Sequence, residues 1–371
     1  DFDAVADQTV SVDTTDDDVA GFTIVELDGA TEVDESGTTD TFTVVLDAQP
    51  SDNVVIAMSS SDIGEATISG TISFTPANWD TPQTITVTGV DENTIDGDQT
   101  STITITIVDS ISDSDFSNVA DQTVSAVTTD DDAAGFTIEE TEGSTEVDES
   151  GTTDTFTVVL DAQPTSDVVL TIISDDTGEA TVNSPLTFTP VNWDTPQTVT
   201  VTGVDEDIVD GTITSTITIA VDDANSDDDF DGAADQTVSA DTLDDDAAGF
   251  TVVELDGATE VTEAGSTDTF TVVLDAQPTS DVVLTVTSDD TSEATVNNPL
   301  TFTPVNWDTP QTVTVTGTDD DLVDGTITST ITIAVDDANS DDDFDSVADQ
   351  TVSVDTTDDD VAGFTIEETD A

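Results

Sequence analysis

The sequence contains no lysine, arginine or histidine, although 86 of its 371 residues are aspartate or glutamate. The formal net charge is therefore −86, and no salt bridge can form between side chains of this chain. Two carboxylates about 4 Å apart repel each other by about 4 kcal/mol at an effective dielectric constant of 20. A compact fold that brings many carboxylates together needs cations from solution. The composition thus predicts bound metal ions or a high-salt environment.

Cysteine and tyrosine are absent as well. Without cysteine there is no disulfide framework, no thiolate metal site and no thiol nucleophile. Carboxylates alone remain for acid–base chemistry, as in a glycosidase, and nothing in the sequence positions a pair of them, so we predict that the chain is not an enzyme. Phosphate contacts need lysine or arginine, so we expect no nucleic-acid partner. No apolar run is long enough to span a bilayer, so we expect no direct membrane insertion.

The sequence repeats with a period of 114 residues. Trp79, Trp193 and Trp307 each lie in the segment Asn-Trp-Asp-Thr-Pro-Gln-Thr, and the tripeptide Gly-Phe-Thr recurs with the same spacing. A fixed period of this kind is typical of tandem-repeat proteins. We predict five segments: 1–18, the last strand of a preceding repeat; 19–132, 133–246 and 247–360, three complete repeats; and 361–371, the first strand of a following repeat. The chain then reads as part of a longer array.

Alternating apolar and polar residues predict strands throughout each repeat. In the first repeat the pattern covers residues 22–27, 41–46, 54–59, 66–74, 84–88, 102–107 and 122–127. Threonine favours strands and carries no charge, so it suits the outward positions, whereas Phe, Val, Ile and Leu suit the inward ones. About seven strands separated by Asp, Gly, Ser and Pro turns predict an all-β fold, a row of immunoglobulin-like β-sandwiches arranged as a linear rod. One tryptophan per repeat beside a turn is expected to be a structural corner residue.

Acidic residues recur in four clusters per repeat, placed in loops and at strand ends. In the first repeat these are Glu35, Asp62, the loop Asp91-Glu92 with Asp96, and the triplet Asp130–Asp132. The triplet lies two residues before the next Gly-Phe-Thr, so it places hard oxygen ligands at a junction between repeats. Calcium prefers six to eight such ligands, whereas zinc favours His or Cys. The alternative is that these residues are solvated turn residues of a chain adapted to high salt.

The repeat resembles the Calx-β domain, the calcium-binding β-sandwich of sodium/calcium exchangers and of large bacterial surface proteins. The resemblance rests on Glu35, on Phe-Thr-Pro followed by Asp-Thr-Pro-Gln-Thr within 74–84, on Val-Asp-Glu at 90–92, and on Asp130–Asp132 followed by Ala-Gly-Phe-Thr. It implies several Ca²⁺ ions per junction, at one end of each sandwich. The implied ligands are Glu35, Asp62, Asp91, Glu92, Asp96, Asp130, Asp131 and Asp132; Glu149, Asp176, Asp205, Glu206, Asp210, Asp244, Asp245 and Asp246; Glu263, Asp290, Asp319, Asp320, Asp324, Asp358, Asp359 and Asp360; and the preceding triplet Asp16, Asp17 and Asp18.

These expectations combine into an extracellular or cell-surface structural rod, stiffened by calcium at junctions that have almost no linker. Its expected partners are neighbouring repeats of the same or identical chains, in a fibre or a bundle. One alternative is a ligand-binding adhesin region, which one repeat with divergent loops would indicate. Another is a filament in which the strand of residues 1–18 is exchanged into a neighbouring subunit.

Overall fold

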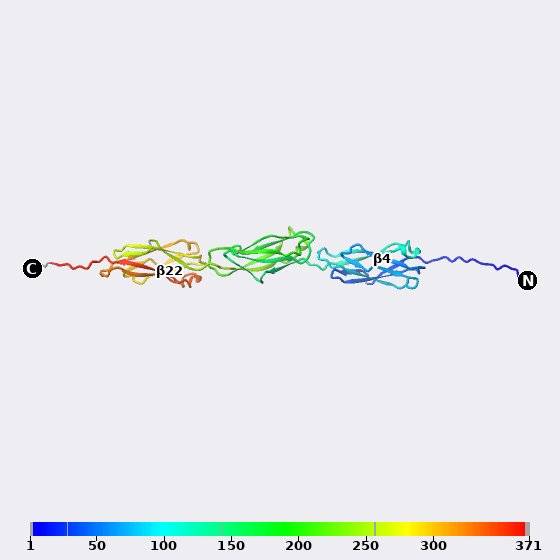
Figure 1. Ribbon diagram of the computed structural model, residues 1–371, viewed down its shortest axis with the longest axis horizontal. Coiled ribbons are helices and arrows are strands. Elements are labelled where there is room, and N and C mark those ends of the chain that lie inside the picture. Colours follow the sequence, from blue (N-terminus) through cyan, green and yellow to red (C-terminus); the bar gives the residue numbers. More distant parts are fainter. Residues whose placement is uncertain (1–2, 28, 142, 256, 368–371) are drawn as a thin grey trace.

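The chain folds into a row of separate β-rich units. The computed structural model describes residues 3–27, 29–141, 143–255 and 257–367. Figure 1 shows three units end to end along one axis, with an extended segment before the first and another after the third. The prediction of tandem all-β sandwiches in a linear arrangement is therefore confirmed.

Unit 1 is a sandwich of two sheets. One sheet has the strand order β1-β3-β7-β5, and the other has the order β2-β9-β8-β4-β6. The elements are β1 (Phe22–Glu26), β2 (Thr31–Asp34), β3 (Thr39–Leu46), β4 (Val54–Ser60), β5 (Ala66–Ile68), β6 (Thr71–Phe74), β7 (Gln83–Gly89), β8 (Gln99–Ile107), η1 (Asp109–Ile111), η2 (Ser114–Phe116) and β9 (Gln122–Thr129).

Units 2 and 3 repeat this topology. Unit 2 consists of β10 (Phe136–Glu140), β11 (Thr145–Asp148), β12 (Thr153–Leu160), β13 (Val168–Ser174), β14 (Ala180–Val182), β15 (Leu186–Phe188), β16 (Gln197–Gly203), β17 (Ile213–Val221), η3 (Asp228–Phe230) and β18 (Gln236–Leu243). Unit 3 consists of β19 (Phe250–Glu254), β20 (Thr259–Thr262), β21 (Thr267–Leu274), β22 (Val282–Ser288), β23 (Ala294–Val296), β24 (Leu300–Phe302), β25 (Gln311–Gly317), β26 (Ile327–Val335), η4 (Asp342–Phe344) and β27 (Gln350–Thr357).

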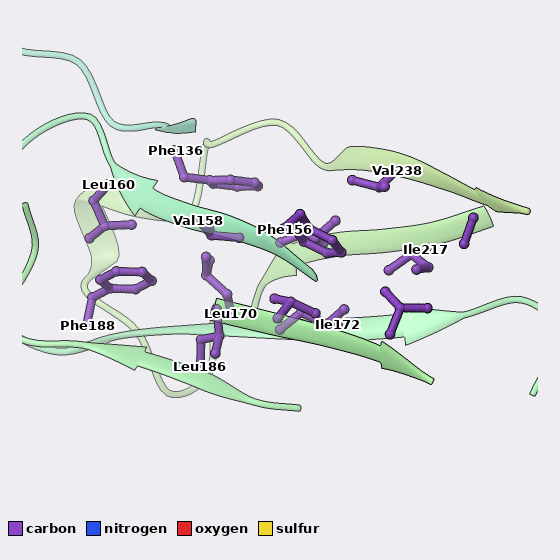
Figure 2. Close-up of a cluster of buried hydrophobic side chains, with 14 of the residues drawn as sticks. Phe136, Phe156, Val158, Leu160, Leu170, Ile172, Leu186, Phe188, Ile217 and Val238 are labelled. Atoms are coloured by element: carbon purple, nitrogen blue, oxygen red, sulfur yellow. The ribbon is translucent and has the colours of Figure 1, made fainter. Parts of the chain in front are cut away.

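Period-two alternation builds the core of each unit between its two sheets. Along β3, Phe42, Val44 and Leu46 are buried. Thr41 and Thr43, which alternate with them, face outward. Figure 2 shows the same layer in unit 2, where Phe156 and Ile217 gather between strands of the two sheets. Burying such side chains provides the main stabilising free energy, because charge pairing within the chain is impossible.

Two details of the strand pattern differ from the sequence prediction. Residues 66–74 were expected to form one strand, but β5 pairs with β7 in one sheet and β6 pairs with β4 in the other. The inward residues Ala66, Ile68, Ile72 and Phe74 keep one alternation across the crossing, so the pattern cannot reveal where the chain changes sheets. The short strand β2 was not predicted, since its four residues include two acids.

The strand β2 decides which loops meet at one end of the unit. It runs parallel to β9, with Thr31 opposite Ala126 and Asp34 opposite Thr129. All the other strand pairs of unit 1 are antiparallel. The carboxyl ends of parallel strands lie at the same edge, so the residues after β2 meet those after β9. Glu35 follows β2 and the acidic triplet follows β9, and the backbone N–H of Glu35 donates to the carbonyl of Thr129 at 3.2 Å.

The tryptophans are corner residues, as predicted. Trp79 is partly buried and packs against the core of unit 1, and its carbonyl accepts the N–H of Leu46 at 3.2 Å. The preceding Asn78 holds the turn, because its Oδ1 accepts the backbone N–H of Thr75 at 2.6 Å. Trp193 and Trp307 pack in the same way in their units.

The segments before β1 and after β27 form no strand where they are described, 3–20 and 361–367. Residues 8–15 repeat the sequence of β27, and Phe364–Glu367 repeat the start of β10, so strands were predicted there. Within unit 1, β9 is hydrogen-bonded to strands on both sides, whereas residues 8–15 pair with none of the described strands. Residues 1, 2 and 368–371 of these predicted strands lie outside the described residues. Among the described residues, no helix is long and apolar enough to cross a membrane.

Candidate metal sites at the junctions

Each unit buries one glutamate whose carboxylate has no hydrogen-bond partner. Glu35, Glu149 and Glu263 are each 0% exposed, and neither oxygen of any of the three accepts a hydrogen bond from the described residues. An ionised carboxylate without a partner costs several kcal/mol to bury. Because the chain has no cationic side chain, these carboxylates must either take up a proton or be compensated by a cation from solution.

Close packing of the backbone holds these glutamates in place. Gly203, the last residue of β16, lies so close to β11 that a Cβ there would be 2.2 Å from the carbonyl oxygen of Asp148. Only glycine permits this approach. The carbonyl belongs to the residue before Glu149, so the contact fixes the backbone that carries the buried carboxylate. Gly89 and Gly317 make the same approach in units 1 and 3.

Further carboxylates converge on each buried glutamate. In each group below, one carboxylate oxygen from every residue lies within 4.8 Å of the others. Ca²⁺–oxygen distances are 2.3–2.6 Å, so two oxygens on opposite sides of one ion are about 5 Å apart, and these groups have the size of a single calcium sphere. The groups are Glu35 with Glu65, Glu92 and Asp96; Glu35 with Asp130 and Asp132; Glu149 with Glu179 and Glu206; Glu149 with Asp245 and Asp246; and Glu263 with Asp358 and Asp360.

Burial and mutual repulsion raise the pKa values of the glutamates at the centre of these clusters. Burial first, and then the charges of Asp130, Glu65 and Glu92, raise the pKa of Glu35 to about 7. The pKa of Glu149 rises to about 7 for the same reasons, with burial the larger cause. Burial followed by the charge of Asp210 likewise raises the pKa of Glu206 to about 7. A bound cation stabilises the ionised forms and reverses these shifts.

Several predicted ligands lie outside the five clusters named above, among them Asp131, Asp210, Asp244, Asp320, Asp324 and Asp359. Besides the residues in the five clusters, Asp62 and its equivalents Asp176 and Asp290 lie in the adjacent loop, where Oδ1 accepts the backbone N–H of Gly64, Gly178 or Ser292 at 2.9–3.0 Å. The exposed carboxylates of Asp91, Asp205 and Asp319 follow β7, β16 and β25 by two residues, at the same end. Their assignment as ligands stays a prediction.

The first aspartate of each triplet also accepts hydrogen bonds from the backbone of a neighbouring loop. Asp244 accepts the backbone N–H groups of Asp210 and Gly211 on Oδ2, at 3.1 and 2.9 Å, and the N–H of Asp246 on Oδ1 at 2.8 Å. It therefore ties the loop before β17 to the segment after β18. Asp130 and Asp358 make the corresponding bonds to Gly97 and Gly325.

Sequence reasoning missed one set of site residues, Glu65, Glu179 and Glu293. They are buried at 9%, 7% and 4% exposure, and Oε2 of each has no hydrogen-bond partner among the described residues. Burial is the largest cause that raises their pKa values. Each glutamate directly precedes a short strand in the tripeptide Glu-Ala-Thr, which recurs every 114 residues. That recurrence was the available signal.

Another buried acid shows what a satisfied carboxylate looks like in this fold. Asp113 lies at the opposite end of unit 1, and its Oδ2 accepts the N–H groups of Ser51 and Asp52 and the hydroxyl of Ser51 at 2.6–2.9 Å. Backbone hydrogen bonds from Asp115 and Asp52 are the main causes that lower its pKa to about 2. Asp113 thus needs no metal, and its equivalents Asp227 and Asp341 have similar bonds.

The loop that carries Glu92 and Asp96 also makes the contact to the next unit. The N–H of Ile95 donates to the carbonyl of Gln163 in unit 2 at 3.3 Å, and the N–H of Gln163 donates to the carbonyl of Asn93 at 2.6 Å. The side chain of Ile95 packs against the core of unit 2. Glu92 and Asp96 belong to the cluster around Glu35, so clustered carboxylates flank the residues that reach the neighbour. Val209 and Gln277 repeat the contact between units 2 and 3.

The triplet Asp16–Asp18 lies at the corresponding place before unit 1. Asp16 and Asp18 line a hollow of about 490 Å³ together with Asp113 and Asp115. The N–H of Asp18 donates to Oδ1 of Asp16 at 3.1 Å, the same turn as in the triplets after β9, β18 and β27. The three residues are exposed in the described structure.

Comparison with known proteins gives only loose likeness. No protein-family model and no curated protein sequence matches the chain. Among solved structures, the calcium binding domain CBD12 of CALX1.1 is 15% identical, with 53% of this chain and 80% of that chain covered and a TM-score of 0.24. Domains 4–9 of the surface layer protein SbsC are 17% identical, with 90% and 49% covered and a TM-score of 0.25. An endo-fucoidan hydrolase of glycoside hydrolase family 107 is 11% identical, with 90% and 43% covered and a TM-score of 0.24.

Proposed function

We propose that this chain is a structural, non-enzymatic rod segment that binds calcium at the junctions between its β-sandwich units. The observation that carries the proposal is the burial of Glu35, Glu149 and Glu263 without hydrogen-bond partners in a chain that has no cationic side chain. Clusters made only of carboxylates favour a hard cation, and their size suits calcium. The assigned ligands are the clustered residues, with Glu65, Glu179 and Glu293 added to the set expected from the sequence.

The mechanical role follows from the position of the clusters. Two clustered acids flank Ile95, and one flanks Val209, the residues that pack into the following unit. A cation that holds these acids fixes the loop between them, and the loop then fixes the angle between neighbouring units. In the absence of calcium, repulsion among the same carboxylates loosens the loop. The rod is therefore stiff when calcium is bound and flexible when it is removed.

The proposed location is outside the cell, at its surface. Calcium-binding extracellular modules bind with dissociation constants of about 10⁻⁴ to 10⁻³ M. Millimolar calcium fills such sites, and the bound ions stabilise the folded state by mass action. A chain with 86 carboxylates and weak sites depends on this supply.

Equilibrium dialysis of the full chain tests the proposal. The variant Glu149→Gln removes the carboxylate that the two clusters of unit 2 share, and it is expected to lose the calcium bound by unit 2 while units 1 and 3 keep theirs. Asp194→Asn, which removes one exposed acid from the tryptophan turn, is the matched control and is expected to bind as much calcium as the parent chain. Equal calcium binding by all three proteins, or replacement of calcium by sodium of equal ionic strength, would overturn the proposal in favour of a salt adaptation.

A further inference from the structure

Charge is distributed very unevenly over the surface of each unit. The outward-pointing residues of β1, β3, β7 and β5, which we call the threonine face, are threonine and valine only. Across the strands Thr41 lies opposite Thr86, and Thr43 opposite Thr84. The face of unit 3 has the same composition on β19, β21, β25 and β23. In unit 2 it carries a single acid, Glu139 on β10.

The outward surface of the opposite sheet carries acidic residues in every unit. Its strand β2 carries the exposed Glu32, and β11 and β20 carry Glu146 and Glu260 at the same position. Asp241 and Asp355 add further acids in units 2 and 3, where unit 1 has Val127. The threonine faces of units 1 and 3 thus carry no acid at the outward positions of their strands, in a chain whose net charge is −86. One acid lies at the edge of each face, where Oδ1 of Asp47 or Asp275 accepts the hydroxyl of Thr23 or Thr251 at 2.7 Å.

These two faces also expose apolar side chains. Val25 on the edge strand β1 is 47% exposed, and Leu27 just after it is 59% exposed. In unit 3 Val253 and Leu255 are 45% and 63% exposed. An uncharged sheet with exposed apolar residues on its edge strand is prone to contact with another protein surface. In unit 2 Glu139 replaces the valine, and like charges oppose such a contact.

We propose that the threonine faces of units 1 and 3 are contact surfaces for a second copy of this chain, side by side. Charge selects this partner, because carboxylates repel one another within a screening length of about 8 Å at physiological ionic strength, and two copies approach most easily through outward strand positions that carry none. Asp47 and Asp275 then lie at the rim of the contact. A cationic partner would bind the acidic surfaces instead. Threonine hydroxyls both donate and accept hydrogen bonds, so one face can pair with a second, identical face.

The area of one threonine face determines how many faces must take part in the contact. The four strands, of 5, 8, 7 and 3 residues, lie about 4.8 Å apart and give about 360 Å² per face. Stable interfaces bury about 800 Å² on each partner, so a single face falls short and two faces of one chain must engage together. The side-by-side contact is therefore a property of the row of units rather than of one unit.

The chain provides its own substitutions for the test. Val25→Glu and Val253→Glu introduce the residue that unit 2 carries at Glu139, so the fold accepts it. Val127→Asp is the matched control, since it adds a charge to the opposite sheet and reproduces Asp241 and Asp355. Sedimentation equilibrium of the full chain over a concentration series, in millimolar calcium, measures the dissociation constant for self-association.

The parent chain is expected to self-associate, and the double variant Val25→Glu/Val253→Glu to associate at least about tenfold more weakly, with an unchanged melting temperature. Val127→Asp is expected to associate like the parent, and Glu139→Val more tightly. A parent chain that stays monomeric, or a Val127→Asp variant weakened as much as the double variant, would overturn the proposal. Repeating the series in 1 M NaCl without calcium separates the two proposals, because the contact persists there even if the metal sites do not bind.

Discussion

The loop that follows β7 appears three times in the molecule, and it is docked twice. In unit 1 Ile95 packs against the core of unit 2, and Val209 packs in the same way against unit 3. The equivalent Val323 in unit 3 is 57% exposed, and Leu322 beside it is 63% exposed. The loops of units 1 and 2 contact Gln163 and Gln277 of the next unit. The described residues 361–367 contain no equivalent glutamine.

This difference assigns a role to the apolar residues of the loop. In unit 3 they bury little surface within their own unit. In units 1 and 2 the equivalent residues pack against the next unit, so the contact between units accounts for their apolar character there. The acids beside them, Glu92 and Asp96 in unit 1, belong to a carboxylate cluster. The carboxylate cluster and the junction contact therefore share one loop, and a change to one is expected to affect the other.

The largest expected effect is a dependence of stability on pH that changes sign with calcium. Glu35, Glu149 and Glu206 have pKa values raised to about 7 in the folded chain, from a usual value of 4.5. Such groups stabilise the metal-free fold while they are protonated. Their contribution is fully present below about pH 4.5 and is lost as the pH rises through 7.

The melting temperature without calcium is therefore expected to fall between pH 5 and pH 8. With saturating calcium it is expected to rise over the same range, because deprotonated ligands bind the metal. Calorimetry at several pH values, with chelator or with calcium, measures both slopes. The variant Glu35→Gln/Glu149→Gln is the control, and it should flatten both. Parallel slopes in the two conditions would contradict the account.

Replacing one buried glutamate is the next largest effect. Glu149→Gln keeps the shape of the side chain but removes the charge that the clusters of unit 2 share. In calcium at about 100 times the dissociation constant, the loss of one site costs about 2.7 kcal/mol. Without calcium the same variant is expected to be more stable than the parent chain, since a buried unpaired charge is gone. Chemical denaturation in both conditions measures the two differences, and a loss of stability in both would indicate an ordinary packing defect.

A methyl group at the close approach is expected to have a somewhat smaller effect. Gly203→Ala forces β16 away from the carbonyl of Asp148, where the added Cβ would be 2.2 Å away. Overpacking of this kind costs about 1–3 kcal/mol, and it displaces Glu149 from its cluster. The expected result is weaker calcium binding in unit 2 by dialysis, together with a lower melting temperature. Gly232→Ala is the matched control in the same unit, because nothing lies within 4 Å of the added Cβ.

The smallest effect tests the docked loops directly. Ile95→Ser removes a side chain that packs into unit 2, at an expected cost of about 1 kcal/mol for its partial burial. Small-angle scattering in calcium should show a broader distribution of angles between units 1 and 2. The same change at the exposed position, Val323→Ser, should alter neither the scattering nor the melting temperature. Equal effects of the two substitutions would remove the distinction between docked and free loops.

Much of this architecture can be predicted from the sequence, because the burial of side chains and the repetition of the unit both leave a regular pattern in it. Alternation such as Phe42, Val44 and Leu46 between threonines states which face is buried, and the 114-residue period states how often the unit recurs. The strand pair β5 and β6 escaped prediction because one alternation runs through both, although they lie in different sheets. Strand β2 is too short and too acidic to be recognised, yet its parallel pairing with β9 brings Glu35 to the triplet.

Membership of a carboxylate cluster is harder to predict for a single acidic residue than for a run of acidic residues. Glu65 opens a strand and has no acidic neighbour in sequence, so only folding reveals that it joins Glu35 and Glu92. Asp113 shows the converse, since its hydrogen bonds to Ser51 and Asp52 make it a satisfied structural acid. Burial combined with the hydrogen-bond partners of each oxygen separates the two cases, and sequence contains neither.

The most direct test of the central claim is a calcium titration of the full chain, followed by melting temperature and by the maximum dimension from small-angle scattering. Both are expected to rise from chelator to millimolar calcium, and sodium at equal ionic strength is expected to reproduce neither rise. If sodium raises both as much as calcium does, the buried carboxylates are neutralised by salt in general, and the junctions are not calcium sites.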